Sequence, residues 1–284
     1  MKKFLLFFCA ALLLMSCSKE APEGKKQVTF NVKGDWSMTT SEMKGGTKSG
    51  SMSANGTDMT DLWIFDYMGE NLVNTIHQVP EDDDWGTPTL DLDYGSHNLY
   101  FVASRGINPT VNNTSKTILF TKVSDTFWKS LNLNVTPSSD GDRDIDLDRV
   151  VTKLKLTITD EIAEGTSTLN ITPNVWYYGI DYTTGAPTNS ASSQAISVSV
   201  PSNYIGQTGQ YATVFSFSAI AEWHTDVLFQ AKTSGGDVLG EVTLNNVPFK
   251  RNRATNFEGP LYGSSGTGTI TVNDTWEPDT NYVW

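Results

Sequence analysis

Apolar and polar residues alternate along much of this chain, in the pattern of strands that bury one face of a β-sheet. Residues 28–32, with the sequence VTFNV, place Val28, Phe30 and Val32 on one face and polar side chains on the other. Residues 150–158 alternate in the same way. The pattern predicts sheets with one apolar face and one solvated face.

Turn residues separate the predicted strands. Residues 61–66 and 72–77 flank a turn containing Gly69, which can adopt positive φ, so they predict a β-hairpin. Residues 97–103 predict a buried strand after a turn at Tyr94 and Gly95. Further strands are predicted near residues 169–171, 176–180, 195–200, 211–218, 227–231, 238–244, 254–261 and 267–272.

One segment predicts a helix. Ser124 can cap residues 125–131, which would place Phe127 and Leu131 on one side of that helix. Because strands do not alternate with long helices anywhere, α/β architectures are disfavoured. We therefore predict an all-β protein with few short helices, built from two β-sandwich domains at residues 28–145 and 146–284.

The first 16 residues predict a signal peptide. Lys2 and Lys3 precede an apolar run that is too short to span a bilayer, and a small residue precedes Cys17. Residues 14–17, LMSC, resemble a bacterial lipobox. The resemblance implies that Cys17 becomes the lipidated N terminus, with residues 17–27 as a tether. An ordinary secretory signal with a cysteine at its cleavage site is the alternative.

The two cysteines and the net charge of the chain limit where the protein can be located and which partners it can bind. Cys9 would leave with the signal and Cys17 would carry lipid, so no disulfide is expected. Ser18 after the cysteine resembles the sorting rule for outer-membrane lipoproteins, which predicts an outer-membrane, cell-surface protein. Loss of Lys2 and Lys3 leaves 18 basic against 32 acidic residues, a net charge of −14. Such a surface repels phosphate backbones, so we expect no nucleic-acid partner.

Few residues indicate reactive chemistry. Asp140, Asp142 and Asp144 supply oxygen ligands on alternate positions, but their segment lacks the Gly and Glu of an EF-hand, so they are weak calcium candidates. We favour a solvated connector that enters a strand with its acids on one face. The three histidines, at positions 77, 97 and 224, have no metal-ligand spacing. Because no catalytic or nucleotide-binding motif is found, we expect neither an enzyme nor a cofactor.

Aromatic residues leave open a second function. If they were exposed, they could stack on sugar rings, which would make the protein a non-catalytic glycan-binding lipoprotein. Most should instead lie in the core, because alternating strands bury about half of their residues. The candidates are Trp85, Trp128, Trp176, Tyr177, Tyr178 and Trp223.

Several segments together resemble the fimbrillin family, the subunits and lipid-anchored minor subunits of type V fimbriae. The resemblance implies two transthyretin-like β-sandwiches, a structural or adhesive role without enzymatic activity, and fimbrial subunits as partners, with host proteins or glycans as further partners. The segments are the lipobox, DLWIFDYMGENLVNTIHQ at 61–78, YGSHNLYFVASRG at 94–106, LDRVVTKLKLTI at 147–158, VPFKRNRATNFEGPLYG at 247–263 and TITVNDTWEP at 269–278.

Assembly in that family proceeds by strand exchange. A protease removes the first strand of a subunit, and a strand of a neighbouring subunit fills the groove by β-augmentation. The resemblance implies that Val28, Phe30 and Val32 form the leaving face, and that Ile270 and Val272 form a donor-type face near the C terminus. Ordinary core packing is the alternative role for all five residues.

The segment after the first strand bears on processing. Residues 37–58 lack any period and are rich in small residues, which predicts a long mobile loop of the kind that proteases cut. Polymerising members of the family have an arginine there, whereas this chain has none before Arg105 and offers only Lys44 and Lys48. Either the subunit keeps its first strand and its lipid as an anchor, or a lysine-directed enzyme cuts it and it polymerises.

Overall fold

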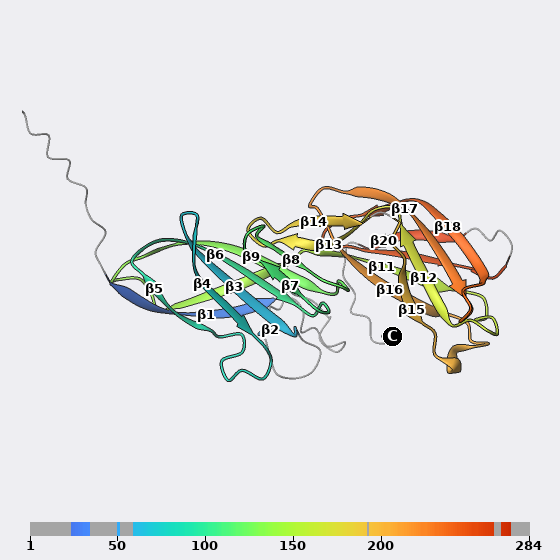
Figure 1. Ribbon diagram of the computed structural model, residues 1–284, viewed down its shortest axis with the longest axis horizontal. Helices are drawn as coiled ribbons and strands as arrows, with labels where there is room; N and C mark the ends of the chain where they lie inside the picture. Colours follow the sequence, from blue (N-terminus) through green and yellow to red (C-terminus); the bar gives the residue numbers. More distant parts are fainter. Residues whose placement is uncertain (1–23, 35–49, 52–58, 192, 264–267, 274–284) are drawn as a thin grey trace, which may run out of the picture.

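The computed structural model describes residues 24–34, 50–51, 59–191, 193–263 and 268–273. The fold is all-β, as predicted, with a 3-10 turn at Ser202–Tyr204 as the only helical segment of the described residues. Two β-sandwiches lie end to end and give an elongated molecule (Figure 1). The chain passes from the first set of strands to the second at Val150.

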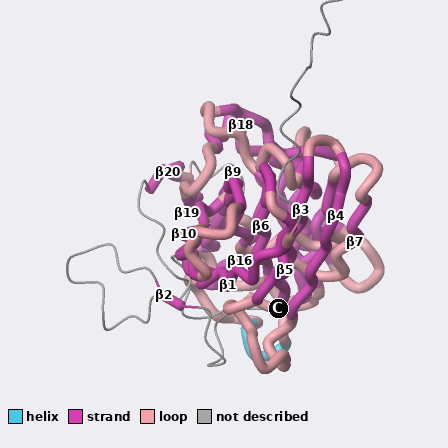
Figure 2. Tube along the Cα trace, turned by 90° about the vertical axis from the view of Figure 1, so that its left-hand side faces the viewer, coloured by secondary structure: helices cyan, strands magenta, loops and turns pink. Residues whose placement is uncertain are grey.

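The first sandwich encloses one apolar core between two layers. Strands β9, β6, β3 and β4 form one layer, and β5, β1 and the first part of β10 form the other. The view from this end shows β3, β4 and β6 side by side (Figure 2). The strands are β1 (Lys25–Gly34), β2 (Gly50–Ser51), β3 (Asp61–Met68), β4 (Asn71–Gln78), β5 (Thr89–Asp93), β6 (Gly95–Ser104), β9 (Thr126–Val135) and β10 (Asp142–Arg149).

The predicted hairpin and the strand after it are confirmed. β3 and β4 pair in antiparallel fashion across a turn in which Gly69 has a φ of +60°, a value that favours glycine. β6 pairs with β3 on its other side. His97 of β6 is fully buried, and its Nδ1 lies 2.7 Å from Oδ1 of Asp66 in β3. The pair thus joins β3 and β6 through side chains as well as through the backbone.

The predicted helix at residues 125–131 is wrong, because this segment is the beginning of β9. Phe127 and Leu131 do lie on one side, since a spacing of four residues is compatible with the periods of both helix and strand. Leu133 and Val135 continue the alternation, and both are buried in the first core. The ten residues of β9 pair along the whole of β6, which gives the strand a long hydrogen-bonded partner.

The second sandwich repeats this two-layer plan. Its core lies between the sheet β16-β11-β19-β20 and the sheet β15-β12-β17-β18. All the strands predicted for this half are present, and the one predicted at residues 176–180 belongs to a separate sheet. The strands of the second sandwich are β11 (Val151–Ile158), β12 (Thr168–Pro173), β15 (Ile196–Ser199), β16 (Gln210–Phe217), β17 (Trp223–Lys232), β18 (Val238–Phe249), β19 (Ala254–Gly259) and β20 (Thr269–Asn273).

A small sheet joins the two sandwiches. β7 (Thr110–Asn112) and β8 (Thr117–Leu119) belong to the first half of the chain, whereas β13 (Trp176–Asp181) and β14 (Ala186–Ala191) belong to the second. β8 pairs with β13, so one continuous sheet contains strands of both halves. Backbone hydrogen bonds therefore cross the junction.

This sheet covers a third apolar cluster, which we call the junction cluster. Within it, the ring of Tyr182 stacks on Phe65 with centroids 3.8 Å apart, and its hydroxyl lies 2.8 Å from that of Tyr67. The indole Nε1 of Trp128 donates to the carbonyl of Tyr182 (2.7 Å). The buried members are Trp63, Phe65, Tyr67, Val102, Ile118, Phe120, Val123, Val150, Val151, Ile180, Tyr182, Phe215 and Phe217.

We expect Tyr182→Ala to lower the free energy of unfolding by about 3–5 kcal/mol, because it removes a large ring from the junction cluster. Tyr182→Phe keeps the stack on Phe65 and loses only the hydroxyl, so it should cost about 1 kcal/mol. Urea denaturation followed by tryptophan fluorescence measures both. Equal losses for the two variants would contradict the importance of the ring stack.

Candidate functional site: the first strand and its groove

β1 occupies an interior position in its sheet. Residues 29–34 run parallel to residues 142–147 of β10, and residues 25–29 run antiparallel to residues 89–93 of β5. The strand that begins the described chain is thus enclosed on both sides by segments from later in the sequence. Removal of β1 would open a groove between β5 and β10.

Backbone hydrogen bonds hold β1 beyond the end of β5. The N–H of Phe30 donates to the carbonyl of Pro88 (3.0 Å), and the N–H of Val32 donates to the carbonyl of Gly86 (2.9 Å). Without β1, these carbonyls and the facing groups of β10 would lose their partners. Because unpaired backbone groups are costly when buried, the groove favours occupation by another strand.

The apolar face of β1 fills the middle of the first core. Val28 and Phe30 are fully buried and Val32 is 2% exposed, and the ring of Phe30 meets that of Phe101 edge-on at 5.3 Å. Burial of three such side chains contributes at most about 5–9 kcal/mol, which is comparable to the whole stability of a domain. A replacement strand must therefore bring three apolar residues at alternate positions.

The other face of β1 is joined to the sheet by exposed ion pairs. Lys25 Nζ lies 3.5 Å from Oδ1 of Asp93, and Lys33 Nζ lies 3.1 Å from Oδ1 of Asp144. Hydrogen bonding to Lys33 lowers the pKa of the Asp144 carboxyl. Exposed pairs contribute little because solvent screens them. The buried face therefore determines which strand fits the groove.

The acidic run enters a strand with its acids on one face, as predicted, but the strand β10 begins already at Asp142 and includes most of the run. In β10, Ile145 and Leu147 are buried, and the aspartates alternate with them on the outer face. Asp140 pairs with Arg143 at 3.2 Å. Among the described residues, no group of three His, Cys, Asp or Glu side chains is arranged to hold a metal ion, so Asp142 and its neighbours acquire no ligand geometry here.

The predicted donor-type residues lie on the terminal strand of the second sandwich. Ile270 and Val272 of β20 pair with Phe257 and Thr255 of β19 and are 37% and 39% exposed. β20 ends the four-stranded sheet, and no strand of the described residues pairs with its other edge. Its sequence, TITVN, has neither a charge nor a proline to block pairing.

Three predicted residues lie outside the described part of the chain: Cys17, Lys44 and Lys48. The described residues include no helix that is long and apolar enough to cross a membrane.

The aromatic residues considered for sugar stacking are largely internal. Trp85 and Trp176 are buried, and Trp176 Nε1 donates to the carbonyl of Phe215. Trp223 is half-buried, and its Nε1 donates to Oγ of Ser218. These side chains pack the cores and the junction, which leaves little indole surface for a ligand.

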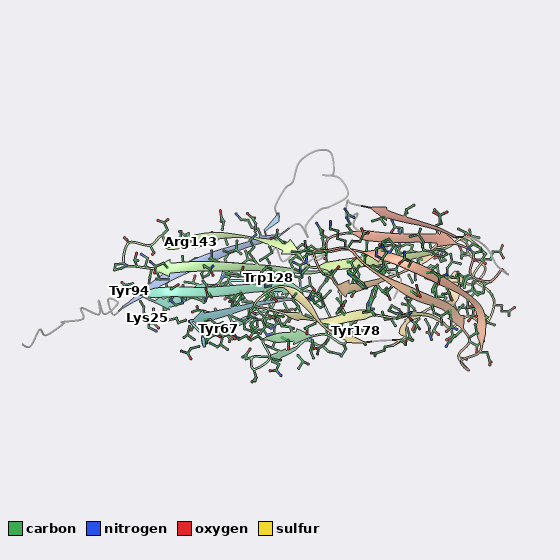
Figure 3. All side chains as sticks on the ribbon, turned by 90° about the horizontal axis from the view of Figure 1, so that it is seen from above. Lys25, Tyr67, Tyr94, Trp128, Arg143 and Tyr178 are labelled. Atoms are coloured by element: carbon green, nitrogen blue, oxygen red, sulfur yellow. The ribbon has the colours of Figure 1, made fainter. Side chains whose placement is uncertain are left out.

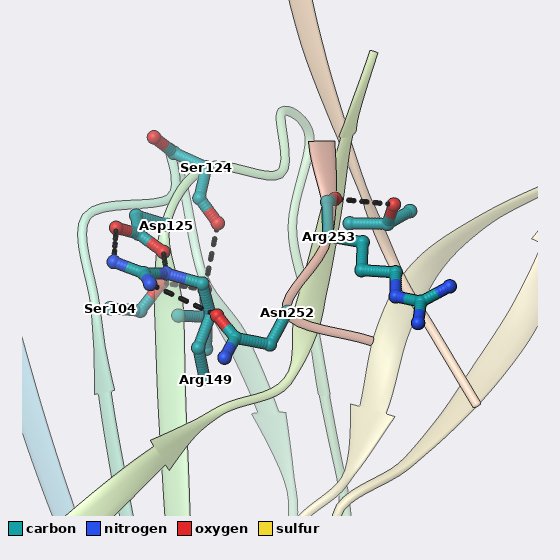
Figure 4. Close-up of polar contacts among 8 residues, drawn as sticks. Ser104, Ser124, Asp125, Arg149, Asn252 and Arg253 are labelled. Atoms are coloured by element: carbon teal, nitrogen blue, oxygen red, sulfur yellow. Dashed lines mark hydrogen bonds and ion pairs between the residues drawn. The ribbon is translucent and has the colours of Figure 1, made fainter. Parts of the chain in front are cut away.

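A buried ion pair reinforces the junction, and the sequence analysis missed it. Arg149 makes two bonds to the carboxylate of Asp125, from Nε at 2.6 Å and from Nη2 at 2.9 Å (Figure 4). Its Nη1 donates to Oδ1 of Asn252 from the second sandwich (3.1 Å). The guanidinium also lies 4.5 Å from the ring centroid of Phe127. Arg149 thus connects the two sandwiches through Asn252, while its charge is paired with that of Asp125.

Arg149→Ala should lower the free energy of unfolding by about 3–5 kcal/mol, because it leaves Asp125 charged and buried without its partner. Arg143→Ala is the matched control, since it removes an exposed pair with Asp140 and should cost less than about 1 kcal/mol. Urea midpoints compare the two. Similar losses of stability for the two variants would mean that the buried Arg149–Asp125 pair contributes no more than an exposed ion pair.

Solved structures of bacterial proteins share this two-sandwich fold. A candidate cell adhesion protein from Bacteroides ovatus ATCC 8483 has a TM-score of 0.51 at 12% identity, covering 90% of this chain and 99% of that one. A candidate adhesin from Bacteroides thetaiotaomicron VPI-5482 has a TM-score of 0.51 at 11% identity, covering 89% and 97%. A candidate polysaccharide-binding protein from the latter strain has a TM-score of 0.51 at 10% identity, covering 88% and 96%.

At these identities the similarity defines the class of fold, an all-β protein built of sandwiches. Residues 95–283 match the model of a family described as a family of unknown function, DUF6562, and the chain belongs to this family. No curated protein matches the sequence.

Proposed function

We propose that this protein is a lipid-anchored subunit of a surface fimbria, with a structural or anchoring role in adhesion, and that its subunits join by β-strand exchange. The observation that carries the proposal is β1, an interior strand whose Val28, Phe30 and Val32 fill the first core. The adhesion role takes support from the candidate adhesins with a similar fold.

The two predicted faces have complementary properties for such an exchange. The apolar face of β1 is enclosed in the core, so removal of β1 would leave an apolar groove that another strand could fill by β-augmentation. Ile270 and Val272 lie on a terminal strand whose free edge carries β-branched residues and no charge. We infer that the C-terminal segment donates, and that the groove of β1 receives a strand only in a subunit that has lost its own first strand.

Exchange can be tested with a protein cut at an engineered protease site within residues 37–49. After release of the fragment that holds β1 in mild denaturant, a labelled peptide of residues 24–34 should rebind. Aspartate at Val28, Phe30 and Val32 should weaken binding at least about 100-fold, because it buries charge in the core. Fluorescence anisotropy measures the affinity.

The matched control peptide carries Thr29→Ser and Asn31→Ser, which change the solvent-facing side of β1 only. It should bind within a few-fold of the original peptide. Equal binding of the aspartate and serine peptides, or failure of the cut protein to release or rebind the strand, would refute a replaceable β1. A peptide of residues 268–284 then tests the donor assignment separately.

For processing, we favour a subunit that keeps its first strand and its lipid, because residues 37–58 contain no arginine. Such a subunit takes part in exchange as a donor only. Mass spectrometry of the protein from its native outer membrane should find a mature chain that begins at an acylated Cys17. A mature chain beginning after Lys44 or Lys48 would instead establish lysine-directed cleavage and a polymerising role. A signal cut that leaves Cys17 unmodified would exclude the anchor.

A further inference from the structure

The groove that β1 fills has a defined pattern of apolar sites. Val28, Phe30 and Val32 occupy three consecutive alternate positions of β1, all buried, with the large ring in the middle. The order valine, phenylalanine, valine reads the same in both directions, so it describes the groove for a strand of either orientation. Because protein cores are close-packed, a strand that fits must supply a large apolar side chain between two smaller ones.

The C-terminal segment supplies only part of this pattern. One face of β20 carries Ile270 and Val272, and the alternate position before them is Gly268, which has no side chain. The next alternate position in the sequence is Asp274. Over residues 268–284, neither set of alternate positions contains three consecutive apolar side chains. The donor strand of this chain therefore does not match the groove of the same chain.

Two registers would place both apolar residues of β20 in the groove, and each leaves a defect in the core. With Ile270 at the middle site, Gly268 leaves one valine site empty, and isoleucine fills less volume than a phenyl ring. With Val272 at the middle site, Asp274 brings a carboxylate to an end site that is closed to solvent in the folded domain. Cavities and buried charges both weaken binding, so a second copy of this chain is a poor acceptor for β20.

Gly268, directly before β20, has no room for a side chain where it lies. A Cβ there would collide with the ring of Phe257, a buried residue of the second core. β20 itself contributes little to that core, because Ile270 and Val272 remain more than a third exposed. The sequence of this segment is thus adapted to rest on β19, and β20 can leave β19 with little loss of buried apolar area.

Charge also distinguishes β1 from the C-terminal segment. β1 brings Lys25 and Lys33, which pair with Asp93 and Asp144 on the two walls of the groove. Figure 3 shows Lys25 at the end of the first sandwich that is remote from the second. Residues 268–284 contain no Lys or Arg but three acidic residues. In a groove without β1, this segment would bring negative charge toward carboxylates that have lost their lysines, which slows association.

We infer that β20 donates to the groove of a different subunit and not to a second copy of this chain. The partner is a β-sandwich whose open groove has two adjacent apolar pockets of the size of isoleucine and valine, no deep pocket at the position of Gly268, and no acidic rim. This inference rests on the proposed strand exchange and names the partner of its donor strand. It gives the protein a place beside a subunit of another kind.

The test measures peptide binding to the protein that has been cut within residues 37–49 and freed of β1. A peptide of residues 264–284 should bind at least about 100-fold more weakly than the peptide of residues 24–34, because of the empty site or the buried carboxylate. Gly268→Val with Ile270→Phe restores the order valine, phenylalanine, valine and should raise the affinity of the longer peptide at least about tenfold. Fluorescence anisotropy measures each affinity.

The matched control peptide carries the same two new side chains in the wrong order, Gly268→Phe with Ile270→Val. It should bind less tightly than the first variant, because a ring at a valine site overpacks the core. Binding of the unaltered 264–284 peptide as tight as that of 24–34, or equal binding of the two variants, would overturn the inference. Failure of 24–34 itself to rebind would refute the exchange on which the inference rests.

The intact protein gives an independent test. The soluble chain after Cys17 is mixed with an equal amount of the cut protein freed of β1, and sedimentation velocity measures their association. Only monomers are expected, because the open groove of one copy does not fit β20 of the other. A complex of the two that the peptide of residues 24–34 displaces would show that copies of this chain join to each other, and would overturn the inference.

Discussion

The enclosure of β1 between β5 and β10 is the constraint on which the first sandwich depends. Its parallel pairing with β10 joins residues more than a hundred positions apart, so the layer cannot close until most of the domain has been arranged. Phe30 then packs on Phe101 in the opposite layer, which ties the two layers through their centre. One segment thus supplies both the sheet hydrogen bonds and the core contacts.

The second sandwich uses the same pairing, since β11 runs parallel to β19 as β1 does to β10. The start of β11 is held by the first sandwich, because β11 follows directly from β10 through Val150. Val150 is buried in the junction cluster, and Arg149 beside it binds Asn252. The first strand of the second sandwich is thereby fixed at its start.

Alternation alone identified most strands, including those of the hairpin around Gly69, because each had one buried face. It failed where helix and strand share a spacing, as for Phe127 and Leu131. It also placed the start of β10 too late, because the outward aspartates resemble a solvated connector. Alternation could not predict the joining sheet, because the pairing of Ile118 with Ile180 depends on how the two sandwiches meet.

An enclosed first strand and an open last strand would give the proposed strand exchange a direction. If both sandwiches had the same kind of open sheet edge, two subunits could pair through identical edges and close into a symmetric dimer. Here the groove of β1 and the edge of β20 are different surfaces on different sandwiches, so a contact between them is head-to-tail. Under the exchange proposed above, the junction would determine the angle between successive contacts, because β8–β13 pairing and the hydrogen bond from Arg149 to Asn252 connect the two sandwiches. A stiff junction would then favour an extended filament over a collapsed chain of subunits.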